Sequence, residues 1–571
     1  MAERKPAPTR AELEPVVMHI LQNEPMFKLG EVDIRGVKQR AYVDAPADLR
    51  FLLVAALEHA EREAVVFEDQ RWTYGELIGK AVAIANGLIS RHGVTPGTRV
   101  ALAMRNSPEW IAAFFGILAA GGVVVPMNGW WTSEEMGFGL EDSGAKLVIA
   151  GFRQAERIQP HVDRLGLTII AGRGEVEGVA DHLEALIEDG AGKPPPELTI
   201  DTDSDFAIFY TSGSTGSPKG AVLTHRGAVN ALMSYGLIGA ALKAVNGDED
   251  FFGDNPAVLV AVPFFHCTGS HAVMMMSFIS GRKMVLMRKW DPEDAVDLID
   301  EEKITNVVGV PTMSHEITLE AARQGRELES LMDMGVGGAK RPTAHVDKLN
   351  EQFPHAWSST GYGLTETNAI GAYNGTNDYQ GRPGSCGRAV PAVIDIKTVR
   401  EDGSTADPNE PGEVWIKGPI LFRGYLNQPE ATADVLTEDG WFRTGDVGVI
   451  DEEGFLFIVD RIKDMILRGG ENVSCLEVEG ALVAHPDIIE AGVIGIPDER
   501  LGECVGAAIL LREGAELSDE EITAFIEPHL AAFKRPEKYW RLDAPLPRGG
   551  TGKVDKPGLR KMLLPEGVSA E

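Results

Sequence analysis

The sequence predicts an α/β protein with a large, multi-layered amino-terminal domain of mostly parallel sheets and a small, mobile carboxyl-terminal α/β domain. Its 571 residues exceed what one hydrophobic core usually supports. Short apolar runs alternate with helix-like segments along most of the chain, which is typical of parallel sheets covered by helices. From about Glu413 the strands become shorter and Gly and Asp more frequent, which indicates a change of architecture.

The first alternating elements lie in the amino-terminal half. TRVALAM (98–104) predicts a strand, PEWIAAFFGILAA (108–120) a helix, and GGVVVPM (121–127) a turn followed by a strand. The apolar runs at 145–151 and 167–172 are bounded by turn residues and predict further strands.

The last hundred residues predict a separate small unit. AGVIGIP (491–497) and GAAILL (506–511) carry strand signals, and SDEEITAFIEPHLAAF (518–533) predicts a helix with a serine cap and an acidic first turn. We expect a large domain over 1–459, a hinge at 460–463 and a small domain over 464–571.

Composition excludes several classes of partner. The formal net charge is −32, from 54 basic and 86 acidic side chains, which disfavours nucleic acids and anionic membrane surfaces. The cysteines are scattered, with no CxxC pair or Cys/His cluster, so neither a zinc site nor a disulfide framework is expected, and a cytoplasmic location fits. The first residues, MAERKPAPTRAELEP, do not resemble a signal peptide.

One uncharged stretch is long enough to cross a bilayer. It runs from Trp110 to Ser133, but Gly121 and Gly122 interrupt it. A buried helix followed by a buried strand explains it better than a membrane span.

The strongest local signal is YTSGSTGSPKGAVLTH (210–225). It combines glycines that allow close backbone approach, several hydroxyl groups and Lys219, which are the groups that a triphosphate needs. It is not a P-loop, because Pro218 stands where that pattern requires its second glycine. The alternative is a flexible Ser/Gly surface loop.

This stretch resembles the signature loop of the acyl-adenylate-forming superfamily, which comprises acyl-CoA synthetases, luciferases and peptide-synthetase adenylation domains. GYGLTET (361–367), WFRTGD (441–446), DRIKDMILRGGENV (460–473) and PRGGTGKVDK (547–556) resemble its later motifs, in the same order. The resemblance extends from about Phe51 to Lys556. It implies an acyl-CoA synthetase that uses ATP, Mg²⁺ and coenzyme A to convert a carboxylic acid first to acyl-AMP and then to acyl-CoA.

The resemblance also assigns the nucleotide contacts. Tyr362 resembles the residue that stacks on adenine, Thr365 the hydroxyl at the α-phosphate and Glu366 the Mg²⁺ ligand, while core packing is the alternative for Tyr362. Asp446 resembles the ribose-binding carboxylate and Arg461 a second ribose contact, although an isolated Asp after Gly is usually a turn residue. The ATP-binding set is completed by Thr211, Ser212, Gly213, Ser214, Thr215, Gly216 and Lys219 in the first loop and by Gly337 and Gly338 beside adenine and the acyl chain, where a plain tight turn is the alternative.

The acyl-transfer residues follow from the same resemblance. Lys553 resembles the lysine that bridges the substrate carboxylate and the α-phosphate, and His266 the gate beside the acyl carbonyl. The alternatives are a solvated lysine and a hydrogen-bonded core histidine. Lys556 is expected to be a surface residue. Lys463 matches the pivot of the family's rotating small domain.

The loop Gly469, Gly470 and Glu471 resembles the lining of a pantetheine tunnel, which is compatible with a simple hairpin turn.

The acid itself is only partly specified. FFHCTG (264–269) lacks the Asp that amino-acid-activating relatives usually carry, and no carrier domain follows Lys556, so free coenzyme A is the expected acceptor. The apolar residues near His266 suggest a medium- or long-chain fatty acid or a bulky aryl-alkanoic acid, although core packing explains Met274–Met276 equally well. A luciferase-like adenylating enzyme and a catalytically inactive acyl- or nucleotide-binding protein are the alternatives, and a homodimer is left open.

Overall fold

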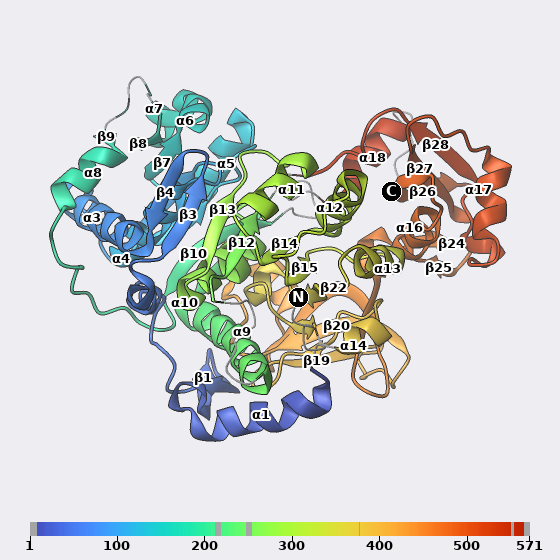
Figure 1. The fold of residues 1–571 in the computed structure, drawn as a ribbon, viewed down its shortest axis with the longest axis horizontal. Helices are drawn as coiled ribbons and strands as arrows, with labels where there is room; N and C mark the ends of the chain where they lie inside the picture. Colours follow the sequence, from blue (N-terminus) through green and yellow to red (C-terminus); the bar gives the residue numbers. More distant parts are fainter. Residues whose placement is uncertain are drawn as a thin grey trace.

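The computed structural model describes residues 8–174, 176, 179, 181–211, 218–246, 254–375, 377–549 and 553–564. The chain folds into a large α/β part and a smaller carboxyl-terminal part, drawn in red at one end of the molecule (Figure 1). The predicted α/β class is therefore confirmed.

The first sheet of the large part has parallel strands at its centre. Strands β6, β5, β7 and β8 are parallel neighbours, and β10 joins β6 in parallel but pairs with β11 in antiparallel fashion. In the described residues its order is β21 (Gly424–Tyr425), β11 (Lys219–Thr224), β10 (Asp205–Thr211), β6 (Val123–Pro126), β5 (Arg99–Ala103), β7 (Leu147–Gly151), β8 (Thr168–Arg173) and β9 (Asp181–His182).

A second sheet stands beside the first and is also mainly parallel. Strands β16, β15, β14, β12, β13 and β3 run in parallel, with antiparallel strands at both edges. Its order in the described residues is β18 (Arg388–Ala389), β17 (Ala372–Asn374), β16 (Trp357–Tyr362), β15 (Asp333–Gly337), β14 (Asn306–Gly309), β12 (Ala257–Val260), β13 (Lys283–Leu286), β3 (Glu63–Phe67) and β4 (Gln70–Thr73).

The remaining sheets are mainly antiparallel. One is the last sheet of the large part and comprises β19 (Asp395–Val399), β20 (Pro411–Lys417), β22 (Trp441–Ile450) and β23 (Leu456–Arg461). The change of architecture expected from about Glu413 therefore begins earlier, at β19. The small part contains β24 (Ile466–Arg468), β25 (Glu471–Val473), β26 (Ile488–Asp498), β27 (Gly502–Leu511) and β28 (Lys538–Leu542). Near the amino terminus, β1 (Leu29–Ile34) and β2 (Val37–Tyr42) form a hairpin.

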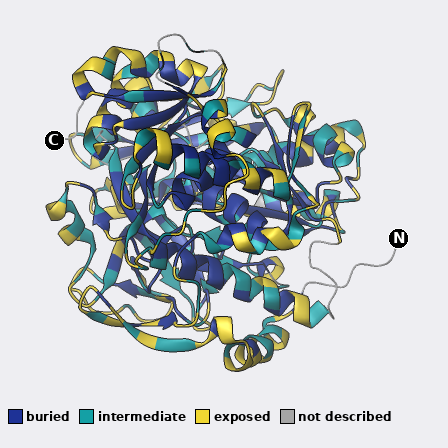
Figure 2. Ribbon diagram, turned by 90° about the vertical axis from the view of Figure 1, so that its left-hand side faces the viewer, coloured by how far each residue is buried: buried dark blue, intermediate teal, exposed yellow. Residues whose placement is uncertain are grey.

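Helices cover these sheets, and buried residues concentrate along the inner elements while exposed ones lie on the outer helices (Figure 2). The helices of the large part are α1 (Arg10–Asn23), α2 (Phe51–Ala56), α3 (Tyr74–His92), α4 (Pro108–Ala119), α5 (Ser133–Ser143), α6 (Phe152–Ile158), α7 (Val162–Leu165), α8 (Leu183–Gly190), α9 (His225–Asn246), α10 (Met276–Ser280), α11 (Pro292–Glu301), α12 (Pro311–Gln324), α13 (Thr343–Gln352), α14 (Asn377–Gly381) and α15 (Pro429–Val435). The small part adds α16 (Cys475–Val483), α17 (Asp519–Ile526) and α18 (Lys556–Leu563).

The uncharged stretch from Trp110 is a core helix followed by a core strand, as expected. Ser107 caps α4 by accepting a hydrogen bond from the Trp110 N–H, and Pro108 occupies the first helical position. Trp110 is fully buried and stacks on Phe114, with ring centroids 5.3 Å apart. Close packing on all sides explains why no charged side chain is tolerated here.

Among the described residues, α9 is long and apolar enough to cross a membrane by length and composition alone. Buried polar contacts favour a core position instead: the Asn230 side chain accepts a hydrogen bond from the Tyr42 N–H, and the Ser234 hydroxyl donates to the Asn230 carbonyl at 2.8 Å. More than half of its most apolar window is buried inside the protein.

The helix predicted over 518–533 is shorter than expected. Ser518 caps α17 as predicted, but the helix ends at Ile526, followed by a short 3₁₀ turn at Ala532–Lys534. Pro528 explains the early end, because proline disfavours helical backbone in the residue before it and lacks an N–H to continue the helix.

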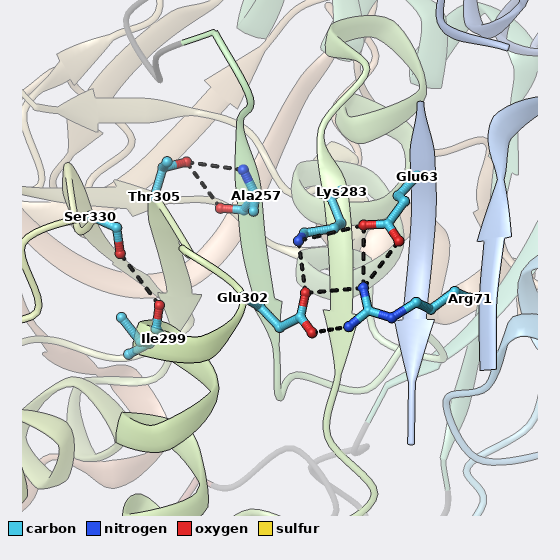
Figure 3. Close-up of polar contacts among 8 residues, drawn as sticks. All are labelled: Glu63, Arg71, Ala257, Lys283, Ile299, Glu302, Thr305 and Ser330. Carbon is cyan, nitrogen blue, oxygen red and sulfur yellow. Dashed lines mark hydrogen bonds and ion pairs between the residues drawn. The ribbon is translucent and has the colours of Figure 1, made fainter. Parts of the chain in front are cut away.

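A cluster of four charged side chains joins one edge of the second sheet to the end of α11 (Figure 3). Arg71 on β4 contacts Glu63 on β3 at 3.0 Å and also pairs with Glu302. Lys283 on β13 pairs with the same Glu302 at 2.7 Å. Because Glu302 is mostly buried, its two cations compensate for the hydration it loses.

Candidate active site

The ends of the phosphate loop are held together by strand pairing. Thr211, the last residue of β10, is the register partner of Lys219, the first residue of β11, and its hydroxyl donates to the Lys219 carbonyl at 3.4 Å. Five predicted phosphate contacts, Ser212, Gly213, Ser214, Thr215 and Gly216, lie outside the described residues. Thr211 and Lys219 therefore mark where the loop leaves and rejoins the first sheet.

The carboxyl ends of β15 and β16 lie side by side. Gly337 is the register partner of Gly361, which precedes Tyr362. Gly338 follows with φ +77°, a left-handed conformation that favours glycine. Ligands of open α/β sheets bind at such strand ends.

Asp446 and Arg461 are neighbours across two strands. They are register partners on β22 and β23, and the Arg461 Nε donates to Asp446 Oδ1 at 2.8 Å. The Tyr362 hydroxyl donates to Asp446 Oδ2 at 2.7 Å, so this buried carboxylate is bonded from both sides. The structure thus brings the predicted adenine and ribose residues into contact.

Glu366 is a buried carboxylate in a 3₁₀ turn, η5 (Thr365–Thr367), directly after the Tyr362 strand. Burial raises the pKa of its carboxyl, and a hydrogen bond from the Tyr425 hydroxyl at 2.7 Å opposes that rise. Within the part of the chain that the structure describes, no basic side chain lies within ion-pair distance of it. A hard oxygen donor left without a cation fits Mg²⁺, which is usually held by one or two carboxylates together with phosphate oxygens and water.

Lys553 reaches this group from the small part. A methyl group at residue 338 would lie 3.3 Å from the Lys553 Cε and 3.8 Å from its Nζ. The side chain remains accessible to solvent, but the surrounding protein lowers the pKa of Lys553. Nearby Arg461 lowers it further, whereas Asp446 and Glu366 oppose this shift, so all three belong to the surroundings of Lys553.

The described residues on either side of 550–552, next to Lys553, are hydrogen-bonded to each other. The Gly549 N–H donates to the Lys553 carbonyl at 2.9 Å, and the Asp555 N–H donates to the Pro547 carbonyl at 2.7 Å. These bonds fix the base of the loop from which Lys553 extends into the large part.

His266 lies close enough to Lys553 for the positive charge of the lysine to disfavour protonation of the imidazole. Burial lowers the pKa of His266 to about 3, and Lys553 lowers it as well, so the imidazole is neutral at physiological pH. Its Nδ1 accepts the Thr268 N–H at 3.3 Å, which leaves Nε2 as a hydrogen-bond donor. A π-helical segment, η4 (Thr268–Met275), follows directly.

The predicted pantetheine loop has different surroundings. Gly469 and Gly470 form the two-residue turn between β24 and β25, with φ of +60° and +90°, values typical of a type I′ hairpin. Residues 469–471 are exposed. Lys463 is also exposed and lies in a 3₁₀ turn, η6 (Ile462–Asp464), between the last strand of the large part and the first of the small part.

The expectation that Lys556 is a surface residue is wrong. Its side chain is 16% exposed and its Nζ lies 3.0 Å from Glu479 Oε1, which fastens α18 to α16. Asp460 was not singled out by the motifs: its buried carboxylate accepts hydrogen bonds from the Ser474 hydroxyl at 3.1 Å and from the Leu476 N–H at 3.2 Å. It joins β23 to the start of α16.

Two regions of the chain match models of known protein families. Residues 53–426 match the model of the family described as AMP-binding enzyme, and residues 477–553 match that of the AMP-binding enzyme C-terminal domain. The chain is 33% identical over 545 residues to a long-chain-fatty-acid–CoA ligase of Bacillus subtilis (90% of this chain, 93% of the relative). It is 33% identical over 495 residues to a feruloyl-CoA synthase of an Amycolatopsis species (86% and 93%).

A solved structure shares the fold. The o-succinylbenzoate coenzyme A synthetase of Bacillus subtilis, in complex with ATP and a magnesium ion, superposes with a TM-score of 0.75 at 28% identity. The match covers 90% of this chain and 99% of that protein.

Proposed function

This chain belongs to the AMP-binding enzyme family and is an AMP-forming acyl-CoA synthetase, and we propose that its acid is apolar: a medium- or long-chain fatty acid or a bulky aryl-alkanoic acid. The position of Lys553 carries the assignment of the site, because this cation lies at the Gly338 strand end beside Glu366, Asp446 and Arg461.

Lys553 serves the first half-reaction. The acid's carboxylate must attack the α-phosphorus of ATP, although both partners are anionic. A fixed ammonium group between them offsets the repulsion and stabilises the charge that develops as pyrophosphate leaves. Asp446 and Arg461 hold the ribose, and Thr365 donates to the α-phosphate.

The metal site is assigned to Glu366. When bound there, Mg²⁺ supplies positive charge to the phosphate oxygens and fixes their geometry. Lys219 and Thr211 hold the phosphate loop at its two ends, and Glu366 supplies the carboxylate ligand from η5.

Aromatic and neutral groups near His266 support an apolar acid. Phe265 packs edge-on against Trp130 with ring centroids 5.5 Å apart, and the neutral His266 places no second cation beside the acyl carbonyl. The names of the two relatives point to the same classes, one a long-chain fatty acid and the other an aryl-substituted acid.

The second half-reaction is assigned to another part of the small domain. The thiolate of coenzyme A attacks the acyl carbonyl, the acyl–phosphate bond breaks and AMP leaves. The Gly469–Glu471 turn would line the pantetheine path after the small domain, 464–571, turns about the 460–463 hinge. A cytoplasmic location fits the four free cysteines, each buried or half-buried.

A panel assay tests the substrate class. The protein is incubated with ATP, Mg²⁺, coenzyme A and acids of three kinds: aliphatic acids of increasing length, aryl-alkanoic acids, and amino acids. AMP release is expected with the longer aliphatic acids and with the aryl-alkanoic acids, and not with the amino acids. Preference for a short, polar or amino acid would contradict the proposed substrate class.

A further inference from the structure

Tyr425 lies where two parts of the candidate site meet. It belongs to β21, a two-residue strand added to the edge of the first sheet beside β11. Tyr425 is the register partner of Ala221, and the Leu426 N–H donates to the Gly220 carbonyl at 2.7 Å. The tyrosine is therefore fixed within two residues of Lys219 in the sheet.

The same segment holds Glu366 at two points. The Tyr425 hydroxyl donates to Glu366 Oε1 at 2.7 Å, and the Phe422 N–H donates to the Glu366 carbonyl at 2.8 Å. One bond sets the backbone of the 3₁₀ turn and the other sets the carboxylate. The ring of Tyr425 also packs against Phe422, with centroids 5.0 Å apart, which limits its rotation.

The face of the Tyr425 ring also contacts a residue of the candidate site, Lys219. The Lys219 Nζ lies 5.1 Å from the ring centroid, within the range of a cation–π contact. A single side chain thus contacts the lysine at the end of the phosphate loop with its face and the metal-ligand candidate with its hydroxyl.

We propose that Tyr425 is a positioning residue for Mg²⁺–ATP: it aims the Glu366 carboxylate at the metal and keeps Lys219 at the phosphates. Accepting the tyrosine hydroxyl occupies one of roughly four acceptor positions of the carboxylate, so the others remain for the metal and its waters. This role rests on the proposed assignment of Glu366 as the metal ligand.

The test separates the hydroxyl from the ring. Tyr425→Phe keeps the ring beneath Lys219 and removes only the bond to Glu366, whereas Tyr425→Leu removes both. Tyr74→Phe is the matched control, because Tyr74 is a buried tyrosine remote from the site, whose hydroxyl donates to the carbonyls of Ser277 and Arg282 at 2.6 and 2.8 Å.

Mn²⁺ serves as the metal probe, since carboxylate and water sites that suit Mg²⁺ also accept it. Its affinity for each protein is measured by electron paramagnetic resonance with ATP held below the protein concentration, so that free ATP does not bind the metal itself. Removing a partner that orients a metal ligand typically costs about 10–100-fold in metal affinity. Tyr425→Phe should show such a loss, together with a matching rise in the Mg²⁺ concentration needed for half-maximal adenylation. Tyr425→Leu should in addition weaken ATP binding, and Tyr74→Phe should change neither quantity.

Wild-type Mn²⁺ affinity in a folded Tyr425→Phe protein would overturn the proposal. So would an equal loss in the reaction of supplied acyl-AMP with coenzyme A, because that pattern indicates general damage to the fold. The Mn²⁺ titration contains neither acid nor coenzyme A, so its result is independent of which acid the enzyme activates.

Discussion

Two loops of the small domain are expected to act at one acyl carbonyl, and they have opposite surroundings. Lys553 extends to the Gly338 strand end, where Asp446 and Glu366 of the large domain and Arg461 of the hinge influence its charge. The Gly469–Gly470 turn is exposed, and a methyl group on Gly470 would meet nothing within 4 Å.

This difference indicates which half-reaction is served by the orientation in which the small domain places Lys553 at the Gly338 strand end. With Lys553 in place, three of the described residues that we assign to adenylation, Glu366, Asp446 and Arg461, surround it, whereas the exposed Gly469–Gly470 turn has none of these three beside it. We infer that the small domain changes orientation between the two half-reactions, with the change taken up at the exposed turn that contains Lys463.

The largest expected effect comes from Lys553→Ala. Adenylation should fall by about 10²–10³-fold, the typical cost of losing one fixed charge-stabilising group in the transition state. Reaction of supplied acyl-AMP with coenzyme A should largely survive, because it does not bring a carboxylate to a triphosphate. Both rates are measured on the same preparation. Equal loss in the two assays would remove the distinction between the loops.

Glu366→Gln tests the large-domain side of the same site. The amide preserves shape but lacks the charge that holds Mg²⁺, so adenylation should fall about 100-fold while the thermal melting curve is unchanged. Acid-dependent ATP–pyrophosphate exchange at a series of Mg²⁺ concentrations provides the measurement. Wild-type exchange at limiting Mg²⁺ would contradict the metal assignment.

A smaller effect, on the second half-reaction instead of the first, is expected at the exposed Gly469–Gly470 turn. Gly470→Ala adds one methyl group to the proposed pantetheine path and should slow thioester formation roughly tenfold, a typical cost for one methyl-sized misfit, without affecting adenylation. Gly514→Ala is the matched control, since Gly514 also has a positive φ, +78°, and open space around it in the same domain. If both variants behave alike, backbone strain and not the path explains the result.

The smallest expected effect is on the pH dependence of stability. It concerns helices α12 and α13, which Figure 1 draws on the side of the large domain that faces the small domain. His315 and His345 stack with centroids 3.7 Å apart, and burial lowers their pKa values to about 4 and about 3. Because the unfolded state takes up these protons first, near its ordinary pKa of about 6.5, stability is full above that pH and is lost as pH falls toward 4.

His345→Phe should therefore reduce the loss of unfolding free energy between pH 7 and 5.5 by roughly 1 kcal/mol. Urea denaturation at the two pH values measures this difference. An unchanged pH dependence would show that the stacked pair does not account for the acid sensitivity.

Sequence patterns predicted those site residues that belong to short motifs of neighbouring residues. The short motifs containing Glu366, Asp446 and Lys553 predicted residues that the structure brings together around one strand end, whereas the glycines and hydroxyls at 212–216 lie outside the described residues. Tyr425 escaped notice because its partner Glu366 lies 59 positions away and a tyrosine after a glycine has no distinctive pattern.

Other features depend on packing that no local pattern encodes. Lys556 looks like a terminal surface lysine until Glu479 of another helix is placed beside it. Within the π-helical segment after Cys267, a methyl group on Gly269 would lie 2.3 Å from the Pro263 carbonyl oxygen, so only glycine fits at that position. The layers themselves were predictable, because the apolar periodicity repeats along the chain.

The most direct test of the two-orientation account compares both half-reactions in Lys463→Pro. Proline fixes φ near −65°, so it should restrict the backbone change at this turn and hold the small domain in the adenylating arrangement. Acid-driven ATP–pyrophosphate exchange should then persist near the wild-type rate while acyl-CoA formation collapses, with a normal melting curve. Wild-type thioester formation in a normally folded Lys463→Pro protein would contradict the account.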